Sequence, residues 1–342
     1  MKIAVIGAGS WGTALAAILG QKHQSVALWV RSPELSGQIE ATRENATYLP
    51  GCKLPRSVAI TASLGEAAGG ASLIVLATPS HAIRQTAAKL VPYIRAESVI
   101  VSAAKGLELA SVKRMSEIIA EELPVVAGQI AVLSGPNHAE EVALHQPAAT
   151  VAAAQSRKVA EYVQDTFMLP YFRVYTNPDI IGVELAGALK NIIALGAGIA
   201  DGLGFGDNAK SALMTRGLAE IARLGMAMGA NPLTFAGLAG IGDLIATCTS
   251  VHSRNRRAGI LLASGKTVDQ LQSETSMVVE GIRATMAAHQ LAAQYEVDMP
   301  ITEQIHQVLY QSKPPKDAVL ELMTRSRTHE VEEVALNHLH WN

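Results

Sequence analysis

Residues 3–12 read Ile3-Ala4-Val5-Ile6-Gly7-Ala8-Gly9-Ser10-Trp11-Gly12, a short apolar run followed at once by a glycine-rich turn. An apolar helical pattern follows over residues 13–19, and a G-x-G-x-x-G sequence between strand and helix is the fingerprint of a dinucleotide-binding unit. Gly7 would permit the tight turn, Gly9 would let a pyrophosphate approach the backbone, and Gly12 would let helix and strand pack closely. The helix N-terminus would offer free N–H groups to the phosphates. The alternative is a glycine-rich turn that binds no ligand.

The first half of the chain alternates short apolar runs with helical patterns. The runs after the first lie at 26–30, 58–60, 73–78, 99–102, 130–133, 150–153 and 173–175. Most are continuous, as expected for strands that are covered on both faces. Helical patterns between them include 82–90, 113–122 and 158–168. The alternation predicts an α/β, Rossmann-like N-terminal domain with a mostly parallel sheet and helices on both sides.

The character of the sequence changes at about Pro178. Asn177-Pro178-Asp179 has the form of a helix start, with Asn177 as the cap and Pro178 at the first helical position. Helical periodicity then continues to about Met323. We therefore expect a dinucleotide-binding domain over 1–180 and an all-α C-terminal domain over 181–330. The tail, 331–342, has no role that the sequence indicates.

The composition fits a two-domain globular protein. Hydrophobic residues make up 49% of the 342 residues, and a net charge of −2 gives no global field for nucleic acid or membrane surfaces. The two cysteines, Cys52 and Cys248, lack a metal-ligand spacing and are too few for a disulfide framework, which favours reduced thiols. The most apolar stretch, 185–200, is interrupted by Lys190 and Asn191, and no signal-peptide cleavage pattern follows Met1. We expect a cytoplasmic protein with no membrane insertion and no nucleic-acid partner.

The end of the second predicted strand bears on the choice of coenzyme. An acidic residue about 20 positions after the glycine loop would bind the ribose 2′-hydroxyl of NAD. Here the strand ends Trp29-Val30-Arg31-Ser32, and no acid occurs before Glu34. Arg31 could pair with a 2′-phosphate instead, which favours NADPH (NADP) and leaves NADH (NAD) open. The alternative is a solvated surface arginine.

Polar residues in two helical segments of the second half suggest chemistry. Lys190 and Asn191 interrupt an otherwise apolar, small-residue pattern over 184–194. Burial lowers the pKa of a lysine and makes it a usable proton donor or acceptor near neutral pH, but a snorkelling lysine fits the periodicity equally well. Downstream, the glycine-rich turn Ala239-Gly240-Ile241-Gly242 precedes Asp243, and Thr247 stands four residues further on, on the same helical face.

The segment that follows is rich in cations. Ser253-Arg254-Asn255 offers polar groups suited to an anion. Because the protein is weakly acidic overall, any anionic ligand must be held by local cations. Arginine is suited to this, since it forms paired hydrogen bonds to phosphate oxygens. The alternative is a solvated basic helix face formed by Arg254, Arg256 and Arg257.

Several short sequence motifs occur along the chain in the order in which one known protein family has them. GAGSWGTALA opens it, and AGIGDLIATCTS is followed by HSRN. Between and after them lie Asn45-Ala46-Thr47-Tyr48-Leu49-Pro50, Ser102-Ala103-Ala104-Lys105-Gly106-Leu107-Glu108, Ser134-Gly135-Pro136, the 184–191 helix and Val278-Val279-Glu280-Gly281. In these features, from Met1 to about Glu330, the chain closely resembles the NAD(P)-dependent glycerol-3-phosphate dehydrogenases of the bacterial type. GDLIATCTS followed by SRN is specific to that family.

The resemblance implies roles for individual residues. Cofactor contacts are implied for Gly7, Gly9, Ser10, Trp11, Gly12, Arg31, Lys105, Ala139, Arg254, Val278 and Glu280. Substrate contacts are implied for Lys105, Gly135, Asn137, Lys190, Asp243, Ser253, Arg254 and Asn255. Lys190 matches the catalytic proton acceptor, and the rest of the catalytic group is Lys105, Asn191, Asp243 and Thr247. Asn137 stands where many relatives have Ser or Thr, and without the resemblance Lys105 would be a surface loop lysine.

The implied reaction interconverts sn-glycerol 3-phosphate and dihydroxyacetone phosphate by hydride transfer between the nicotinamide and C2 of the substrate. Lys190 would donate a proton to the ketone oxygen during reduction and accept it in reverse. Lys105 would stabilise the charge that develops on that oxygen. The resemblance also implies a Rossmann domain followed by a helical domain, commonly a homodimer, and a role in supplying phospholipid synthesis.

Three alternatives have less support. His138, Glu141 and His145 lie roughly on one helical face, but their segment reads as an ordinary amphipathic helix and the reaction needs no metal, so neither they nor His338-Leu339-His340 predict a metal site. A dehydrogenase of the β-hydroxyacid or ketopantoate-reductase kind would share the glycine loop but not GDLIATCTS with SRN. A dinucleotide-sensing protein without catalysis would not need Lys105, Lys190 and Asp243 together.

Overall fold

The computed structural model describes residues 1–342 apart from 275–278, 328 and 331–342. An eight-stranded sheet of order β3-β2-β1-β4-β5-β6-β7-β8 forms the centre of the N-terminal part. Neighbouring strands are parallel except β6 and β7, which are antiparallel. The strands are β1 (Ile3–Ile6), β2 (Val26–Trp29), β3 (Val58–Thr61), β4 (Leu73–Leu76), β5 (Val99–Ser102), β6 (Ile130–Ser134), β7 (Ala148–Ala154) and β8 (Phe172–Asn177). The predicted strands and the mostly parallel sheet are confirmed.

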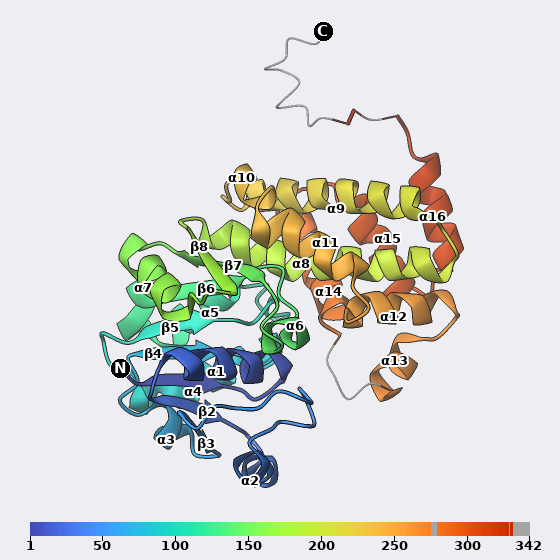
Figure 1. Ribbon diagram of the computed structural model, residues 1–342. Helices are drawn as coiled ribbons and strands as arrows, with labels where there is room; N and C mark the ends of the chain where they lie inside the picture. The colour runs from blue at the N-terminus through green and yellow to red at the C-terminus, as the bar shows by residue number, and fades with distance from the viewer. Residues whose placement is uncertain (275–278, 328, 331–342) are drawn as a thin grey trace.

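Helices cover both faces of this sheet (Figure 1). On one face, α1 (Ser10–Lys22) and α7 (Arg157–Phe167) contribute to one hydrophobic core. On the other, α3 (Leu64–Ala68), α4 (Ile83–Leu90) and α5 (Met115–Glu122) contribute to a second core. Every residue of β1, β4 and β5 is buried, which explains their continuous apolar sequences. Two further helices of this part are α2 (Pro33–Thr42) and α6 (Ala139–Ala143).

After β8, the longer elements of the described chain are all helices. They are α8 (Ile180–Gly202), α9 (Asp207–Ala227), α10 (Pro232–Phe235), a π-helical turn (Leu238–Gly242), α11 (Asp243–Thr249), α12 (Arg254–Ala263), α13 (Val268–Glu274), α14 (Glu280–Gln294), α15 (Pro300–Tyr310) and α16 (Pro315–Thr324). Figure 1 shows α8 between α9 and α12, with its first turns beside the sheet. The fold class is therefore the predicted one, a Rossmann-like α/β domain followed by an all-α domain.

The start of α8 differs from the sequence-based expectation. The cap is Asp179, whose Oδ1 accepts a hydrogen bond from Gly182 N at 2.9 Å, and not Asn177, which accepts one from Asp179 N. Pro178 precedes the helix. The Oδ2 atom of Asp179 also accepts hydrogen bonds from Asn231 N and Thr234 Oγ1, so a tertiary contact with α10 determines which residue caps the helix.

The segments Ile180–Gly202 and Pro232–Thr249 are each long and apolar enough to cross a membrane, judged by length and composition alone. The apolar window of α8 is 94% buried inside the protein, compared with 44% for the second segment. Small residues explain how α8 is enclosed: a Cβ atom on Gly198 would lie 1.9 Å from Arg256 O in α12. The length and hydropathy of α8 are thus those of a core helix packed backbone to backbone against its neighbour.

The glycine-rich segment before Asp243 is also not the turn that the sequence suggests. Residues Leu238–Gly242 form a π-helical turn that continues directly into α11. A Cβ atom on Gly240 would lie 2.0 Å from the carbonyl oxygen of Phe235, so glycine allows this close approach. The turn thereby sets where α11, and with it Asp243, begins.

Candidate active site

The glycine loop connects β1 to α1 at the carboxyl edge of the sheet. Gly7 has a φ of +116°, which favours glycine, and a Cβ atom there would lie 3.0 Å from backbone atoms of Ala77 and Thr78. A Cβ atom on Gly12 would lie 1.9 Å from Gly7 O, whereas one on Gly9 would meet nothing within 4 Å. The loop is therefore packed tightly on its protein side and open at Gly9. It fits a bound pyrophosphate, because within the described part of the chain no side chain caps the N-terminus of α1 and occupies its N–H groups.

Buried polar atoms without a partner gather along the same edge. Thr78 Oγ1 follows β4, Ser102 Oγ ends β5 and Ser134 Oγ ends β6, and none of the three has a hydrogen-bond partner in the described part of the chain. Buried polar atoms are normally paired. Unpaired ones beside a glycine loop of this kind therefore fit a ligand that would supply their hydrogen-bond partners. Ligands of open α/β sheets bind at the carboxyl ends of the strands.

Ser10 and Trp11 differ in how their side chains are used. Ser10 Oγ donates to Tyr48 O at 2.6 Å, whereas the Trp11 ring lies 6.5 Å from that of Phe172 and its buried Nε1 has no hydrogen-bond partner among the described residues. The backbone N–H groups of both residues, in the first turn of α1, can meet a phosphate. Asn45 supports the loop from outside, since its Nδ2 donates to Ala8 O and to Thr13 Oγ1, both at 2.8 Å. The sequence motif contained Asn45, but no role was predicted for it.

Arg31 and Glu280, both predicted to contact the cofactor, come from different halves of the chain. Arg31 follows β2, is exposed, and has no ion pair or side-chain hydrogen bond with any other residue that the structure describes. Glu280, the first residue of α14, accepts a hydrogen bond from Ser80 Oγ at 2.9 Å and so connects the helical domain to the loop after β4. Val278, also predicted to contact the cofactor, lies outside the described residues.

Two lysines from distant parts of the chain share one carboxylate. Lys190 Nζ in α8 donates to Asp243 Oδ1 and to Thr247 Oγ1, each at 2.5 Å. Lys105 Nζ, in the loop after β5, donates to Asp243 Oδ2 at 2.7 Å and to Gly135 O at 2.9 Å. Asp243 and Thr247 therefore lie on one face of α11, as their spacing predicts. The Lys190 side chain is only 7% exposed, so the snorkelling interpretation was wrong.

Burial and charge set the protonation of this cluster. Burial, helped by the charge of Lys105, lowers the pKa of Lys190 to about 8 although Asp243 acts in the opposite direction. Burial also disfavours the ionised form of Asp243, but the charges and hydrogen bonds of the two lysines outweigh it and hold the pKa of that carboxyl below its ordinary value. Asp243 is thus ionised near neutral pH, while Lys190 can exist with or without its proton.

The hydrogen bonds leave donors free for a ligand. An ammonium group has three N–H donors, and each lysine uses two of them within the described part of the chain. The Thr247 hydroxyl donates to Asp243 O at 2.6 Å, so its lone pairs accept the bond from Lys190. One N–H of Lys190 and one of Lys105 can therefore meet an oxygen atom that becomes negative during a reaction.

Glycines allow the two lysines to come together. A Cβ atom on Gly187, one turn before Lys190, would lie 2.7 Å from Ser134 Oγ and 3.6 Å from Lys105 Cγ. On Gly135 it would lie 2.9 Å from Thr150 Cα. The loop after β5 and the end of β6 can thus approach α8 closely. Gly135 was predicted as a substrate contact, whereas the steric role of Gly187 was missed, because periodicity gives no sign of which helical glycine faces a neighbour.

Asn137 and Ala139 lie in the adjoining loop. Asn137 Nδ2 donates to Pro136 O at 3.1 Å and to Ala149 O at 2.9 Å, which turns the amide towards the protein backbone. Its Oδ1 is buried and has no partner among the described residues. Ala139 is the first residue of α6 and is 7% exposed. The side chain of Asn137 therefore braces the loop and keeps one acceptor for a ligand.

The polar segment that begins α12 is joined to the Lys190 cluster. Asn255 Nδ2 donates to Asn191 Oδ1 at 2.8 Å, and Asn255 Oδ1 accepts from Gly281 N at 2.9 Å. Asn191, next to Lys190, in turn donates to carbonyls of α8. Ser253 caps α12 by accepting from Arg256 N, and Arg254 is exposed. Asn255 thus joins α8, α12 and α14, and among the described residues it retains one N–H without a partner, while Arg254 at the helix N-terminus makes no side-chain hydrogen bond or ion pair with any of them.

Two further side-chain groups near the cluster were not predicted. His138, considered in the sequence only as a metal ligand, precedes α6 and contacts Ala246 O of α11 at 3.4 Å, and burial lowers the pKa of its imidazole. Glu184, in α8, accepts from Arg114 at 2.7 Å and from Ser116 N at 2.8 Å at the start of α5. A buried carboxylate six residues before Lys190 was the available signal, since such a group must be paired.

Comparisons with known proteins agree with this architecture. The model of the NAD-dependent glycerol-3-phosphate dehydrogenase N-terminus matches residues 2–160, and that of the C-terminus matches residues 179–320. Fold and site define a two-domain protein with a Rossmann-like, dinucleotide-type half and a helical half that carries a buried lysine. The chain belongs to the NAD-dependent glycerol-3-phosphate dehydrogenase family.

Individual relatives extend over almost the whole chain. It is 59% identical over 330 residues to a Moorella thermoacetica protein named glycerol-3-phosphate dehydrogenase (NAD(P)+), covering 96% of this chain and 98% of that one. A crystal structure of glycerol-3-phosphate dehydrogenase from Coxiella burnetii has a TM-score of 0.89 and 39% identity, covering 95% and 99%. A ketopantoate reductase from Ralstonia eutropha, at 16% identity and a TM-score of 0.60 (93% and 100% covered), shares the fold alone.

Proposed function

We propose that this chain is an NAD(P)H-linked dehydrogenase that interconverts sn-glycerol 3-phosphate and dihydroxyacetone phosphate. The observation that carries the proposal is the Asp243 carboxylate shared between Lys190 and Lys105, beside a glycine loop suited to a dinucleotide. The cofactor supplies the hydride in reduction and takes it up in oxidation. The family membership and the names of the full-length relatives support the same reaction.

The residues of the cluster divide the proton chemistry among them. Lys190 gives a proton to the ketone oxygen in reduction and removes it from the hydroxyl in oxidation, using the N–H that its protein contacts leave free. Lys105 directs its own free N–H to the same oxygen and stabilises the negative charge that develops there. Asp243 orients both ammonium groups, and Thr247 fixes the direction of Lys190 by accepting its second hydrogen bond.

The phosphate of the substrate meets the N-terminus of α12. Arg254 provides an exposed guanidinium, and the helix N-terminus adds backbone N–H groups and a positive dipole end. The bond between Asn255 and Asn191 supports this assignment, because it holds the start of α12 beside the turn of α8 that carries Lys190. Ser253, Asn255, Gly135 and Asn137 complete the substrate site in this proposal.

The cofactor would bind along the glycine loop, with further contacts from Ala139, Arg254 and Glu280. The family resemblance implies a contact for Val278 as well, which lies outside the described residues. Arg31, exposed at the end of β2, favours NADPH over NADH. We further propose that the two domains divide near residue 180, that the enzyme works in the cytoplasm as a homodimer without a catalytic metal, and that its glycerol 3-phosphate supplies phospholipid synthesis.

A spectrophotometric assay at 340 nm tests the proposal. Purified protein with NADPH and dihydroxyacetone phosphate should show loss of absorbance, and the reverse pair should show a gain. Ketopantoate and unphosphorylated dihydroxyacetone serve as comparison substrates. Faster turnover of ketopantoate would favour the related reductase class instead. Dinucleotide binding by fluorescence titration with no turnover of any of these substrates would favour a sensing protein.

A further inference from the structure

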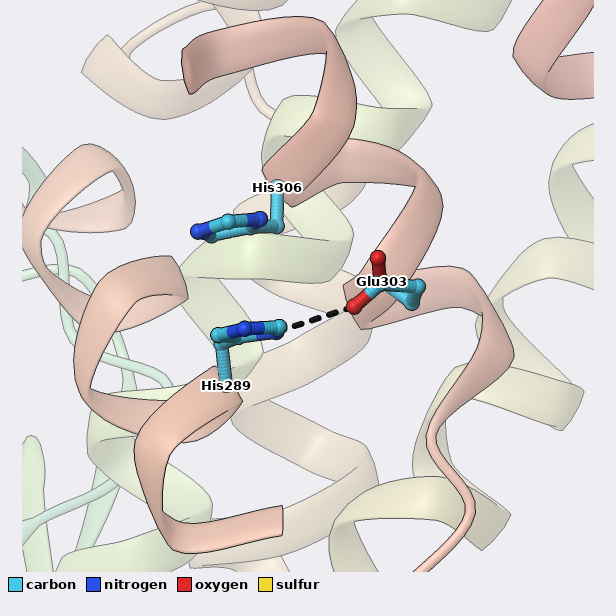
Figure 2. Close-up of side chains that lie close together, drawn as sticks. All are labelled: His289, Glu303 and His306. Carbon is cyan, nitrogen blue, oxygen red and sulfur yellow. Dashed lines mark ion pairs between the residues drawn. The ribbon is translucent and has the colours of Figure 1, made fainter. Parts of the chain in front are cut away.

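In the helical domain, α14 and α15 bring together three side chains of metal-ligating types. Figure 2 shows His289 on α14 facing Glu303 and His306 on α15. His289 Nδ1 lies 2.9 Å from Glu303 Oε2, and the two imidazole rings are stacked with centroids 3.9 Å apart. One ligand atom from each of the three residues lies within 4.8 Å of the other two. None of them belongs to the Lys190 cluster described above.

The spacing within α15 accounts for part of this grouping. Glu303 and His306 are three residues apart, which places them on one face of the helix, next to α14. His306 is only 7% exposed, and its Nδ1 has no hydrogen-bond partner in the part of the chain that the structure describes. A buried ring nitrogen without a partner costs free energy, and stacking on another imidazole does not satisfy it.

The group is accessible from one side. An open pocket of about 400 Å³ is lined by His289 and Glu303, together with Glu296, Asp298 and Thr302. The side chains of His289 and Glu303 are each 39% exposed, whereas His306 is only 7% exposed and lies behind them, against the stacked ring of His289. The pocket offers an entry path and room for a water molecule beside an ion.

We propose that His289, Glu303 and His306 bind a divalent transition-metal ion of the Zn²⁺ type. Two imidazoles and one carboxylate form a common zinc donor set, and water from the pocket would complete a tetrahedron. Imidazole nitrogen selects Zn²⁺ and its neighbours over Mg²⁺ and Ca²⁺, which prefer oxygen ligands. The site ties α14 to α15 and takes no part in the proposed hydride transfer.

Binding requires a small rearrangement. The lone pair of an imidazole nitrogen lies in the plane of the ring, and the two rings are only 6° from parallel. One ring must therefore turn about its Cβ–Cγ bond before both nitrogens point at one ion. His289 can turn, because it is partly exposed to the pocket, and its hydrogen bond to Glu303 is then replaced by the metal. Gln307, which donates to Glu303 Oε1 at 2.7 Å, would keep the carboxylate oriented.

Isothermal titration with ZnCl₂ tests the site on the full-length protein at pH 7.5, where imidazoles are mostly neutral. We expect one Zn²⁺ per chain and no comparable binding of MgCl₂. Saturation at about 100 times Kd should raise Tm by roughly 5 °C. No binding of Zn²⁺ below about 1 mM, or equal binding of Mg²⁺, overturns the proposal.

Variants locate the ion. His289→Gln, Glu303→Gln and His306→Gln should each weaken Zn²⁺ binding at least about tenfold. His145→Asn, which removes an exposed imidazole at a position of positive φ that asparagine tolerates, should leave affinity unchanged. If His306→Gln does not fold, the partly exposed His289 and Glu303 still decide the matter. Affinity that survives these changes, or is lost only when His338 and His340 are replaced, assigns Zn²⁺ elsewhere and overturns the proposal.

Discussion

Lys190 Nζ lies 2.5 Å from Asp243 Oδ1, and both side chains are almost fully enclosed, with exposed fractions of 7% and 3%. An isolated ion pair would raise the pKa of the lysine. Here burial, together with the charge of Lys105, outweighs that attraction and lowers the pKa of Lys190 to about 8. The lysine therefore gains and loses its proton within a pH range in which enzymes can be assayed.

The first prediction concerns the pH dependence of the two directions. Reduction of dihydroxyacetone phosphate needs protonated Lys190, so its kcat/KM, which reports the ionisation of the free enzyme, should fall as pH rises through about 8. Oxidation of glycerol 3-phosphate needs the neutral amine, so its kcat/KM should rise through the same pH. Initial rates at substrate concentrations well below KM, between about pH 6.5 and 9.5, measure both. The same trend in both directions would show that another group is being titrated.

Asp243→Asn provides a positional check on that assignment. Removing the carboxylate deletes the main interaction that favours the charged lysine, so the inflection should move below the wild-type value. A lower rate with an unchanged inflection pH would show that the pH–rate profile does not report the ionisation of Lys190.

The second prediction concerns the proton donor itself. Lys190→Ala should lower kcat roughly 10²–10⁴-fold, the usual effect of losing a general acid. Cofactor affinity, measured by quenching of protein fluorescence, should stay nearly unchanged. The exposed Lys89→Ala on α4 is the matched control and should keep full activity. Near-normal turnover of Lys190→Ala would remove this residue from the mechanism.

Most of the sheet could be predicted from sequence because its central strands are buried on both faces and so appear as continuous apolar runs. Strands such as β1 and β4 have no exposed position to interrupt the pattern. The cap of α8 could not be predicted in the same way, because Asp179 is selected by contacts with Asn231 and Thr234, which lie far along the chain. Local preference alone favoured Asn177.

The site shows the same division. The four-residue spacing of Asp243 and Thr247 is local and was sufficient to place both on one helical face. The approach of Lys105 to Asp243 spans 138 residues of sequence and depends on Gly187, where a side chain would collide with Ser134. Only the family resemblance suggested that Lys105 belonged to the site. The roles of the predicted contacts towards ligands stay predictions.

The third prediction concerns the coenzyme. Arg31→Asp should weaken binding of NADPH more than that of NADH, because it replaces a cation near the expected 2′-phosphate by an anion. KM values for the two coenzymes measure the difference. Arg56→Asp, an exposed change in the same domain with the same effect on net charge, should alter both coenzymes equally and weakly. Equal losses for Arg31→Asp would place Arg31 away from the 2′-phosphate.

The fourth prediction concerns stability. Glu220 in α9 is 3% exposed and accepts hydrogen bonds from Ile301 N at 2.6 Å and Thr302 N at 3.1 Å, the first donors of α15. Burial raises the pKa of its carboxyl to about 7 despite these bonds. The folded protein then holds a proton that the unfolded chain has lost, so this group's stabilisation is complete below about pH 4.5 and declines as pH rises through about 7.

Glu220→Gln, which cannot ionise, should lack that decline. Urea unfolding at about pH 5 and 8 measures the free energy of unfolding of both proteins. Between these pH values the wild-type protein should lose roughly 2–3 kcal/mol of unfolding free energy relative to Glu220→Gln. Contributions from other groups, including Lys190, cancel in this difference. The exposed Glu40→Gln should run parallel to the wild type. If the unfolding free energy of Glu220→Gln had the same pH dependence as that of the wild type, Glu220 would be ionised in the folded protein throughout this pH range.

The fifth prediction concerns recognition of the phosphate. Arg254 is exposed at the start of α12, whereas Arg256 pairs with Asp201 at 2.6 Å and is occupied. The alternative of a uniform solvated basic face therefore does not describe all three arginines of this helix. Binding energy from a remote phosphate can be used to orient the reacting carbon, so its loss lowers kcat/KM. Arg254→Ala should depress kcat/KM for dihydroxyacetone phosphate by roughly 10²-fold or more.

The comparison that decides this is between two substrates and two arginines. Unphosphorylated dihydroxyacetone cannot use a phosphate site, so its already low rate should scarcely change in Arg254→Ala. Arg257→Ala removes an exposed arginine from the same helix and controls for the loss of charge. Comparable losses with both substrates would assign Arg254 to the cofactor or to structure, and an equal loss in Arg257→Ala would indicate a general electrostatic effect. Only a loss confined to Arg254 and to the phosphorylated substrate fits a direct contact, because a distant surface charge acts on any anion that approaches.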